Sequence, residues 1–427
     1  MLRTLRSLVL VFLAAGIATG AFLQSLGNET LNNAAEVVQA FGAVWLNGLR
    51  MTVAPLVFAL LVAAVASVAS AVATGRLAAR AVLLFTGLLF FAGIYAVIAS
   101  KGLLAIWPVD PAAAEAFLAG AAQSGVEPAR LAGFSDWLQS LVPANVFRAA
   151  AEDAILPLTV FAILFGFAAT RLAPEPRALI VNIFSAISEA MVVIIHWILA
   201  FAPFGVFALA LGVGLNVGFG AAGLLAQYAI FVSLCIIGVI AFAYLFAVMF
   251  GRVGVLRFAA AIAPAQVVAA STQSSIATLP AMLEVARGPL GVPKRVADII
   301  LPMAVAVFRF TSPVGNLAVC FFVAALYGFE PSLLQIVGAI FVAYAISIAA
   351  VGLPGQVSFI TSVAPICAAL GLPTEVLGIL IAVEVVPDIF RTIGNVTGDL
   401  MAATILKREA AGEATPNPAD APADALA

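Results

Sequence analysis

Charged side chains are scarce in this sequence. Asp, Glu, Lys and Arg make up only 9% of the 427 residues, whereas 64% are hydrophobic. A soluble domain carries roughly a quarter of its residues as charged side chains. The composition therefore excludes a soluble fold, and the mean hydropathy of +1.18 places the chain among integral membrane proteins.

Histidine and cysteine are also rare. The single histidine, His196, lies in an apolar run, and Cys235, Cys320 and Cys367 lie in separate apolar segments without CxxC spacing. Neither a disulfide nor a metal site is predicted from these positions. A membrane-embedded hydrolase would need a nucleophile beside a base, and His196 is remote in sequence from the serines near Ser274. We therefore predict that the protein is not an enzyme.

What the chain has in abundance is long apolar segments. A helix needs about 20 residues to cross a bilayer, and these segments show none of the alternation expected of barrel strands. The sequence predicts an all-α membrane protein whose spans lie near residues 8–24, 43–70, 79–106, 150–171, 178–213, 225–250, 296–326 and 373–405.

The placement of charge predicts the orientation. If the N-terminus is cytoplasmic, 13 of the 19 Lys and Arg residues fall on the cytoplasmic side, and the acidic loop from Lys101 to Ala144 lies outside. This agrees with the positive-inside rule. We therefore expect a multi-pass protein of the cell inner membrane with both termini in the cytoplasm. The inside set is Arg3, Arg6, Arg76, Arg80, Arg171, Arg177, Arg252, Arg257, Arg287, Lys294, Arg295, Lys407 and Arg408.

Two hydrophobic stretches are interrupted near their middles by small and polar residues. Residues 258–290 are broken at Ser271–Ser275 and at Pro280, and residues 333–370 are broken at 352–356 and Ser358. Neither half of either stretch can span a bilayer alone. Each stretch fits a re-entrant helical hairpin, whose irregular tip is tolerated only where it lines a cavity enclosed by protein. Paired broken segments are the best sequence pointer to a transporter site; the alternative is two kinked helices with short loops.

The last apolar segment carries a stripe of polar residues: Glu384, Asp388, Arg391, Asn395 and Asp399 follow one another at spacings of 4, 3, 4 and 4. Such spacings place them on one helix face. Each intramembrane charge costs about 2.5–3.5 kcal/mol even on the lenient insertion scale, so such residues mark functional sites by default. The alternative is a structural ion network, in which Asp388 and Arg391 pair at i,i+3.

This last segment resembles the dicarboxylate/amino acid:cation symporters, the family of the glutamate transporters. The motif D-x-x-R-T-x-x-N-V-T-G-D is present from Asp388 to Asp399. Residues 274–280 resemble the serine-rich tip of the family's first hairpin, and residues 352–355 resemble the tip of its second hairpin. With weaker similarity upstream, at residues 156–166 and 202–209, the resemblance covers roughly residues 5–408.

The resemblance implies eight transmembrane helices plus two re-entrant hairpins in a glutamate-transporter-like elevator fold, assembled as a homotrimer. Scaffold helices 1–2 would occupy residues 1–75 and scaffold helices 4–5 residues 145–224. The moving part would comprise helix 3 with its extracellular loop (76–144), helix 6 (225–257) and a transport core (258–408). A disordered cytoplasmic tail would follow at 409–427.

The resemblance also implies roles for residues. Arg391 would hold the distal carboxylate of an acidic substrate through its guanidinium fork, and Asp388 would accept the α-ammonium group. Because Asp388 would repel a substrate that lacks an amine, it favours aspartate or glutamate over a plain dicarboxylate. The remaining substrate residues would be Asn395, Thr392, Ser274, Ser275, Ser312 and Gly355.

The sequence departs from the family pattern where coupling ions bind. The seventh-helix motif N-M-D-G-T aligns with Phe308-Arg309-Phe310-Thr311-Ser312, and a hydroxyl pair of the third helix falls near Phe91 and Ala92. Losing one carboxylate and gaining one guanidinium shifts the charge by +2, the charge of two bound sodium ions. We therefore predict that Arg309 replaces bound cation and pairs with Asp399 or Asp388. A residual sodium site would be left at Asp399 and Asn395, and Glu384 would be a candidate for proton coupling.

The sequence thus predicts a secondary active transporter of acidic amino acids with weakened or lost sodium coupling. One alternative is a sodium- or proton-coupled C4-dicarboxylate symporter, and another is a substrate-gated anion channel or a non-transporting receptor on the same fold. The expected partners are the substrate, the lipid bilayer and further copies of the chain. No nucleic acid and no cofactor beyond a coupling Na⁺ or H⁺ are expected.

Overall fold

The computed structural model describes residues 2–26, 29–72, 76–121, 139, 141–152, 154–217, 220–349 and 355–413. Three predicted features lie wholly or partly outside these residues: the middle of the 101–144 loop, residues 352–354 of the second hairpin tip, and the tail from residue 414 onward. The side chains of residues 356–358 also lie outside what is described.

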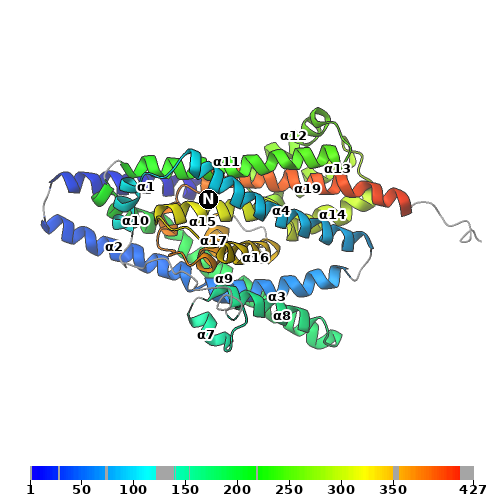
Figure 1. Cartoon of the computed structure of the whole chain (residues 1–427), viewed down its shortest axis with the longest axis horizontal. Coiled ribbons are helices and arrows are strands. Elements are labelled where there is room, and N and C mark those ends of the chain that lie inside the picture. The colour runs from blue at the N-terminus through cyan, green and yellow to red at the C-terminus, as the bar shows by residue number, and fades with distance from the viewer. Residues whose placement is uncertain are drawn as a thin grey trace, which may run out of the picture.

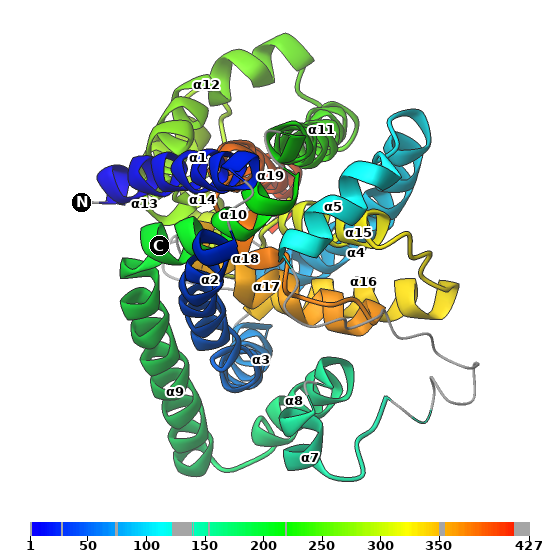
Figure 2. The same cartoon turned by 90° about the vertical axis from the view of Figure 1, so that its left-hand side faces the viewer.

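Every regular element in the described residues is a helix, and the helices form an elongated bundle (Figures 1 and 2). They are α1 (Leu2–Leu26), α2 (Glu29–Arg50), α3 (Val53–Val72), α4 (Arg76–Ile106), α5 (Pro111–Ala121), α7 (Val146–Ala151), α8 (Ile155–Ala169), α9 (Pro174–Ala200), α10 (Ala202–Val217), α11 (Gly220–Met249), α12 (Val255–Thr272), α13 (Ser275–Arg287), α14 (Lys294–Val307), α15 (Ser312–Leu326), α16 (Leu333–Ala349), α17 (Gly355–Leu370), α18 (Leu377–Leu380) and α19 (Val385–Glu413).

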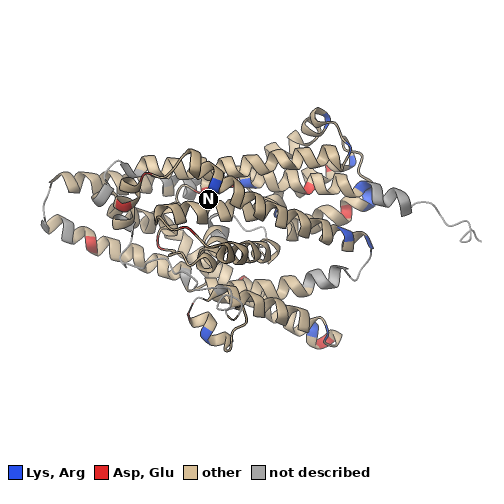
Figure 3. Ribbon diagram, viewed as in Figure 1, with Lys and Arg blue, Asp and Glu red and all other residues tan. Residues whose placement is uncertain are grey.

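The chain is a multi-pass membrane protein by the length and composition of these helices. Six helical stretches among the described residues are long and apolar enough to cross a bilayer. In Figure 3 most of the ribbon carries no charge, and charged residues gather mainly at the right-hand end, where α13, α14 and α19 lie. Several expected spans are divided into consecutive helices: α2 and α3 meet at residues 51–52, and α9 and α10 meet at Phe201.

The first predicted hairpin turns at the expected position. Between α12 and α13, Gln273 adopts a left-handed conformation with φ of 50°, and the Ser274 side chain caps α13 by accepting a hydrogen bond from the backbone N–H of Ala277 at 3.3 Å. The left-handed residue reverses the chain, and the serine cap satisfies an amide that would otherwise lack a partner. The arms of the second stretch are α16 and α17. A re-entrant path through a bilayer stays a prediction for both pairs of helices, α12 with α13 and α16 with α17.

The expected span at residues 296–326 is interrupted at its centre. Helix α14 ends at Val307 and α15 starts at Ser312, so Phe308, Arg309, Phe310 and Thr311 connect the two helices. Pro313 lies in the first turn of α15, where its missing N–H costs no hydrogen bond. The interruption exposes backbone groups inside the bundle, and such groups must find partners within the protein.

Helices α1 and α10 approach each other closely through glycines. Gly16 and Gly20 of α1 form a small-xxx-small pair, and Gly214 of α10 lies against the backbone of Ile17. A side chain at any of these glycines would overlap backbone of the facing helix. Small residues at such positions let membrane helices pack closely, and packing of this kind stabilises helix pairs in lipid.

This contact predicts opposite effects for the same substitution at two sites. In Gly214→Ala the new methyl overlaps the carbonyl oxygen of Ile17, whereas in Gly87→Ala on α4 it meets no atom within 4 Å. We expect Gly214→Ala to lower the free energy of unfolding by about 1–3 kcal/mol through overpacking. Gly87→Ala should leave it unchanged or raise it by up to about 1 kcal/mol. Thermal unfolding in detergent measures both, and an equal or higher melting temperature for Gly214→Ala would contradict the packing described.

Candidate functional site

The polar stripe of α19 faces the interior of the protein and not lipid. Its five members, Glu384, Asp388, Arg391, Asn395 and Asp399, have exposed fractions between 0% and 5%. Helix α19 packs against α11, α14 and the two helices of the first hairpin, α12 and α13. Charges buried this deeply are stable only when they are paired or hydrogen-bonded.

Arg391 is the centre of a buried network. Its Nη2 donates to Glu384 Oε1 at 2.6 Å, and its Nη1 donates to Asn316 Oδ1 at 2.7 Å. The other oxygen of Glu384 accepts the hydroxyl of Tyr228 at 2.8 Å. The amide of Asn316 donates in turn to the Ser312 hydroxyl at 3.2 Å. The network therefore connects α11, α15 and α19 around one guanidinium.

Arg391 forms an ion pair with Glu384, which lies seven residues earlier and directly before α19. The structural ion network that the sequence leaves open as an alternative would instead pair Arg391 with Asp388 at i,i+3. Two helical turns bring residues i and i+7 onto the same face, and the extended arginine side chain covers that distance. Of its donors, Nε has no hydrogen-bond partner among the described residues.

Asn395 fixes the interrupted segment between α14 and α15. Its Oδ1 accepts the backbone N–H of Thr311 at 2.9 Å and the Thr311 hydroxyl at 2.8 Å. The same hydroxyl lies 2.9 Å from the carbonyl oxygen of Arg391. These contacts use both lone pairs of the amide oxygen. The backbone N–H of Thr311, which the break between α14 and α15 leaves without a helical partner, is thereby satisfied by a side chain of α19.

Arg309 lies in the same interrupted segment and is 9% exposed. It is close enough to Asp388, Asp399 and Arg391 to interact with each electrostatically. Asp399 interacts with Arg309 in this way, and neither of its carboxylate oxygens accepts a hydrogen bond from the described residues. The pairing of Arg309 with Asp399 or Asp388 stays a prediction.

Aromatic side chains surround Arg309 in the sequence. Phe308 stacks on Phe85 of α4 with ring centroids 4.5 Å apart, and it also contacts Phe310 at 5.8 Å. Phe310 is fully buried against Gly398 of α19, where an added side-chain carbon would collide with its ring. Phe91, near the expected hydroxyl pair, packs on Phe242 and Phe246. Hydrocarbon, which offers no oxygen ligand to a cation, fills these positions.

Several predicted substrate residues are not joined to this network. All hydrogen bonds of Ser274 are made within the hairpin tip, to Thr272, Ala277 and Thr278, and Ser275 begins α13. The Thr392 hydroxyl donates to the backbone oxygen of Asp388, one turn earlier, at 3.0 Å. Gly355 begins α17, next to residues outside the described part of the chain.

Sequence reasoning missed three participants: Asn316, Thr311 and Tyr228. Asn316 carried a usable signal, because it is a lone amide one turn after Ser312 in an otherwise apolar helix, and polar residues in such helices face the protein interior. Thr311 precedes Ser312-Pro313, a combination typical of a helix start. Tyr228 gave no comparable signal, since its hydrogen bond depends on how α11 packs against α19.

The observed broken helices and buried stripe agree with one family of transporters. A family model described as the sodium:dicarboxylate symporter family matches residues 5–409. The chain belongs to this family. As a member it is a transporter and not an enzyme, and the match confirms the resemblance seen in the last helix.

Relatives of this symporter cover nearly all of its length. It is 26% identical over 414 residues to the proton/glutamate-aspartate symporter of Escherichia coli K12, covering 94% of this chain and 91% of the relative. It is 29% identical over 443 residues to the human neutral amino acid transporter B(0), covering 94% of this chain and 79% of the relative. The proton/sodium-glutamate symport protein of Bacillus caldotenax is 26% identical over 422 residues, covering 94% of this chain and 93% of that protein.

The buried pair in this symporter predicts strong coupling between two substitutions. Glu384→Gln or Arg391→Gln alone leaves one buried charge without a partner and should cost about 3–5 kcal/mol of unfolding free energy. The double variant should lose much less than the sum of the two. Thermal unfolding of the wild type, the two single variants and the double variant measures this coupling.

The matched control is the exposed pair of Arg148 and Glu152, which are 2.8 Å apart at i,i+4. Arg148→Gln and Glu152→Gln should show no measurable coupling, because exposed pairs are screened by water. Additive losses at Glu384 and Arg391 would contradict the energetic role of the buried pair.

Proposed function

We propose that this symporter transports acidic amino acids, aspartate or glutamate, and that Arg391 binds the distal carboxylate of the substrate. The observation that carries the proposal is a buried guanidinium of which, among the described residues, only Nη1 and Nη2 are engaged, by Asn316 and Glu384. A guanidinium has five N–H groups, so donors remain for an anion. Glu384 and Asn316 hold the group in place, which reduces the entropy lost when a carboxylate binds.

The neighbours of Arg391 suit the rest of an amino acid. Asp388 is 5% exposed on the same helix face and offers a negative charge to an ammonium group. Asn395 has its oxygen occupied by Thr311, while its Nδ2 donates to none of the described residues. An amide held in that way suits a carboxylate acceptor. Together the three side chains present a cation, an anion and a neutral donor, which matches aspartate better than a plain dicarboxylate.

We further propose that Arg309 supplies the positive charge that coupling cations provide elsewhere in the family. With all five groups ionised, Glu384, Asp388 and Asp399 carry three negative charges, and Arg309 and Arg391 carry two positive charges. Sodium favours several hard oxygen ligands. At the proposed residual site the Asn395 oxygen is already bound twice, so Asp399 is the remaining side-chain ligand. Sodium coupling is therefore weak or absent.

Transport on this proposal follows an elevator mechanism in a homotrimer of the inner membrane, with both termini cytoplasmic. The transport part comprises α4, α11 and α12 to α19. The scaffold comprises α1 to α3 and α7 to α10. Exposed aromatic and apolar residues on α2, α9 and α10, such as Phe41, Trp197 and Phe204, suit contact with lipid or with other copies of the chain.

The first test is ion dependence. The rate of labelled L-aspartate uptake into proteoliposomes should change by no more than about twofold when sodium and potassium are both omitted. The positive charge of Arg309 belongs to the chain and is not removed with the salt. A steep loss without sodium would reject the coupling proposal. A pH gradient applied in the same vesicles distinguishes proton coupling from uncoupled exchange, and saturable counterflow distinguishes a carrier from a channel or receptor.

Variants of Arg309 test its role as a counter-cation. Arg309→Met should lower sodium-free uptake by about tenfold or more, since two carboxylates lose a buried cation. Arg309→Lys keeps the charge and should retain more of the uptake. Equal uptake by wild type and Arg309→Met would show that the arginine is not a counter-cation.

The second test concerns the substrate. L-aspartate, L-glutamate, neutral amino acids and C4-dicarboxylates are compared by thermal shift, each with and without sodium, because stabilisation follows RT ln(1 + [L]/Kd). Acidic amino acids should stabilise the wild type most. Arg391→Ala should abolish that preference, and Arg391→Lys should weaken it because the bidentate fork is lost. Unchanged stabilisation by acidic ligands in Arg391→Ala would rule out the assigned role.

A further inference from the structure

A cavity with two charged residues in its lining lies away from the polar stripe, between the end of α4 and the segment that follows α15. Its volume is about 470 Å³, and it is lined by residues of α4, residues of α15 and the connection from Gly328 to Pro331. None of the residues of the Arg391 network takes part in it. Cavities of this size hold small ligands.

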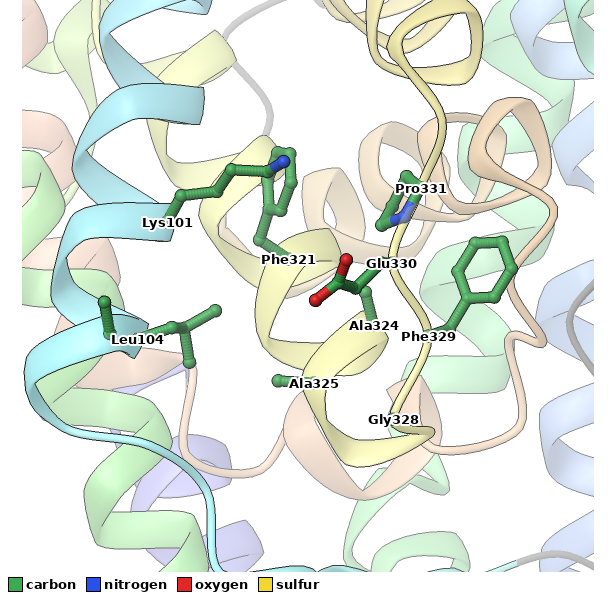
Figure 4. Close-up of a pocket in the computed structure, with 10 residues that line it drawn as sticks. Lys101, Leu104, Phe321, Ala324, Ala325, Gly328, Phe329, Glu330 and Pro331 are labelled. Carbon is green, nitrogen blue, oxygen red and sulfur yellow. The ribbon is translucent and has the colours of Figure 1, made fainter.

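Two opposite charges face each other across this cavity. Figure 4 shows Lys101 reaching in from α4 and Glu330 reaching in from the other wall, with Phe321, Ala324 and Ala325 nearby. Lys101 and Glu330 have no hydrogen bond or ion pair with any residue in the described part of the chain. A lysine and a carboxylate on separate walls therefore both remain available to a ligand that carries both signs of charge.

The rest of the lining is apolar, and part of it is buried. Phe321, Ala324 and Phe329 are each less than 10% exposed, whereas Leu104 is half-buried and Ala105 is exposed. Leu104 and Ala105 continue this apolar wall on α4. A ligand that fills the cavity thus needs a hydrocarbon part beside its two charges. A free amino acid offers little hydrocarbon, whereas a phospholipid offers acyl chains.

The position of the cavity along the helices fits a lipid headgroup. Trp107 directly follows the last residue of α4 and is 37% exposed, and Tyr327 directly follows the last residue of α15. Tryptophan and tyrosine are enriched at the level of the headgroups, and lysine extends its ammonium group to the same level. This placement predicts that the charges of the cavity lie at the level of the phosphate and amine of a lipid.

We propose that this cavity binds one phosphatidylethanolamine molecule, with its phosphate at Lys101, its ammonium at Glu330 and an acyl chain along Phe321 and Leu104. A primary ammonium has three N–H donors for a carboxylate. A choline headgroup has none, and an anionic glycerol headgroup places no cation against Glu330. The binding site is independent of the proposed substrate and coupling ion, and it connects α4 to the segment between α15 and α16.

The test uses the full-length protein in nanodiscs made from phosphatidylcholine, phosphatidylglycerol or phosphatidylethanolamine mixtures with identical acyl chains. Phosphatidylethanolamine should raise the melting temperature of the wild type above its value in the other two lipids. Native mass spectrometry should detect one more retained phosphatidylethanolamine in the wild type than in Lys101→Gln or Glu330→Gln. Each neutralised charge should weaken this binding by about fivefold.

Two further variants keep the outcome decisive. The swap Lys101→Glu with Glu330→Lys preserves a pair of opposite charges and should keep part of the lipid-specific stabilisation. Arg148→Gln alters an exposed residue of α7 and should keep all of it. The melting temperature in phosphatidylcholine reports whether each variant is folded.

Three results would overturn the proposal. The lipid-specific stabilisation would be unchanged in both Lys101→Gln and Glu330→Gln, or phosphatidylglycerol would stabilise as strongly as phosphatidylethanolamine. In the third, soluble glycine or glycerophosphoethanolamine would give the stabilisation without any phosphatidylethanolamine, which would assign the cavity to a free zwitterion.

Discussion

The arrangement of this protein depends on keeping a guanidinium inside a membrane-embedded bundle. An isolated charge there is costly, and Arg391 is tolerated because Glu384 and Asn316 both accept hydrogen bonds from it. Tyr228 then satisfies the remaining oxygen of Glu384. Each partner comes from a different element, so the charge can be buried only when α11, α15 and the region of α19 are packed together. Formation of the polar site and packing of these helices therefore depend on each other.

The interrupted helix follows from the same constraint applied to the backbone. Ending α14 at Val307 leaves main-chain groups that lipid cannot satisfy. The Asn395 side chain accepts the N–H of Thr311, and the Thr311 hydroxyl reaches back to α19. One polar face of α19 therefore supports both a buried cation and an irregular segment. That segment in turn brings Arg309 into the electrostatic range of Asp399.

The aromatic residues around Arg309 set the polarity of this region. Phe308 and Phe310 place hydrocarbon on both sides of Arg309 in the sequence, at positions predicted to align with an amide and a carboxylate of the family motif, and Phe85 of α4 stacks on Phe308. A fixed side-chain cation in these surroundings is bound permanently, whereas a sodium ion must lose its water each time it enters. This difference is the physical basis for the coupling proposed for this symporter.

The sequence by itself determined the helical membrane class, the position of the first hairpin turn near Gln273 and the polar face of α19, because hydrophobic length and helical periodicity are local properties. The last-helix motif also predicted the family. Only the tertiary structure decided which charges meet. It paired Arg391 with Glu384, and it added Asn316, Thr311 and Tyr228. It also divided residues 296–326 into two helices and placed Lys101 opposite Glu330. Such pairings depend on contacts between segments far apart in the chain, and no local pattern encodes them.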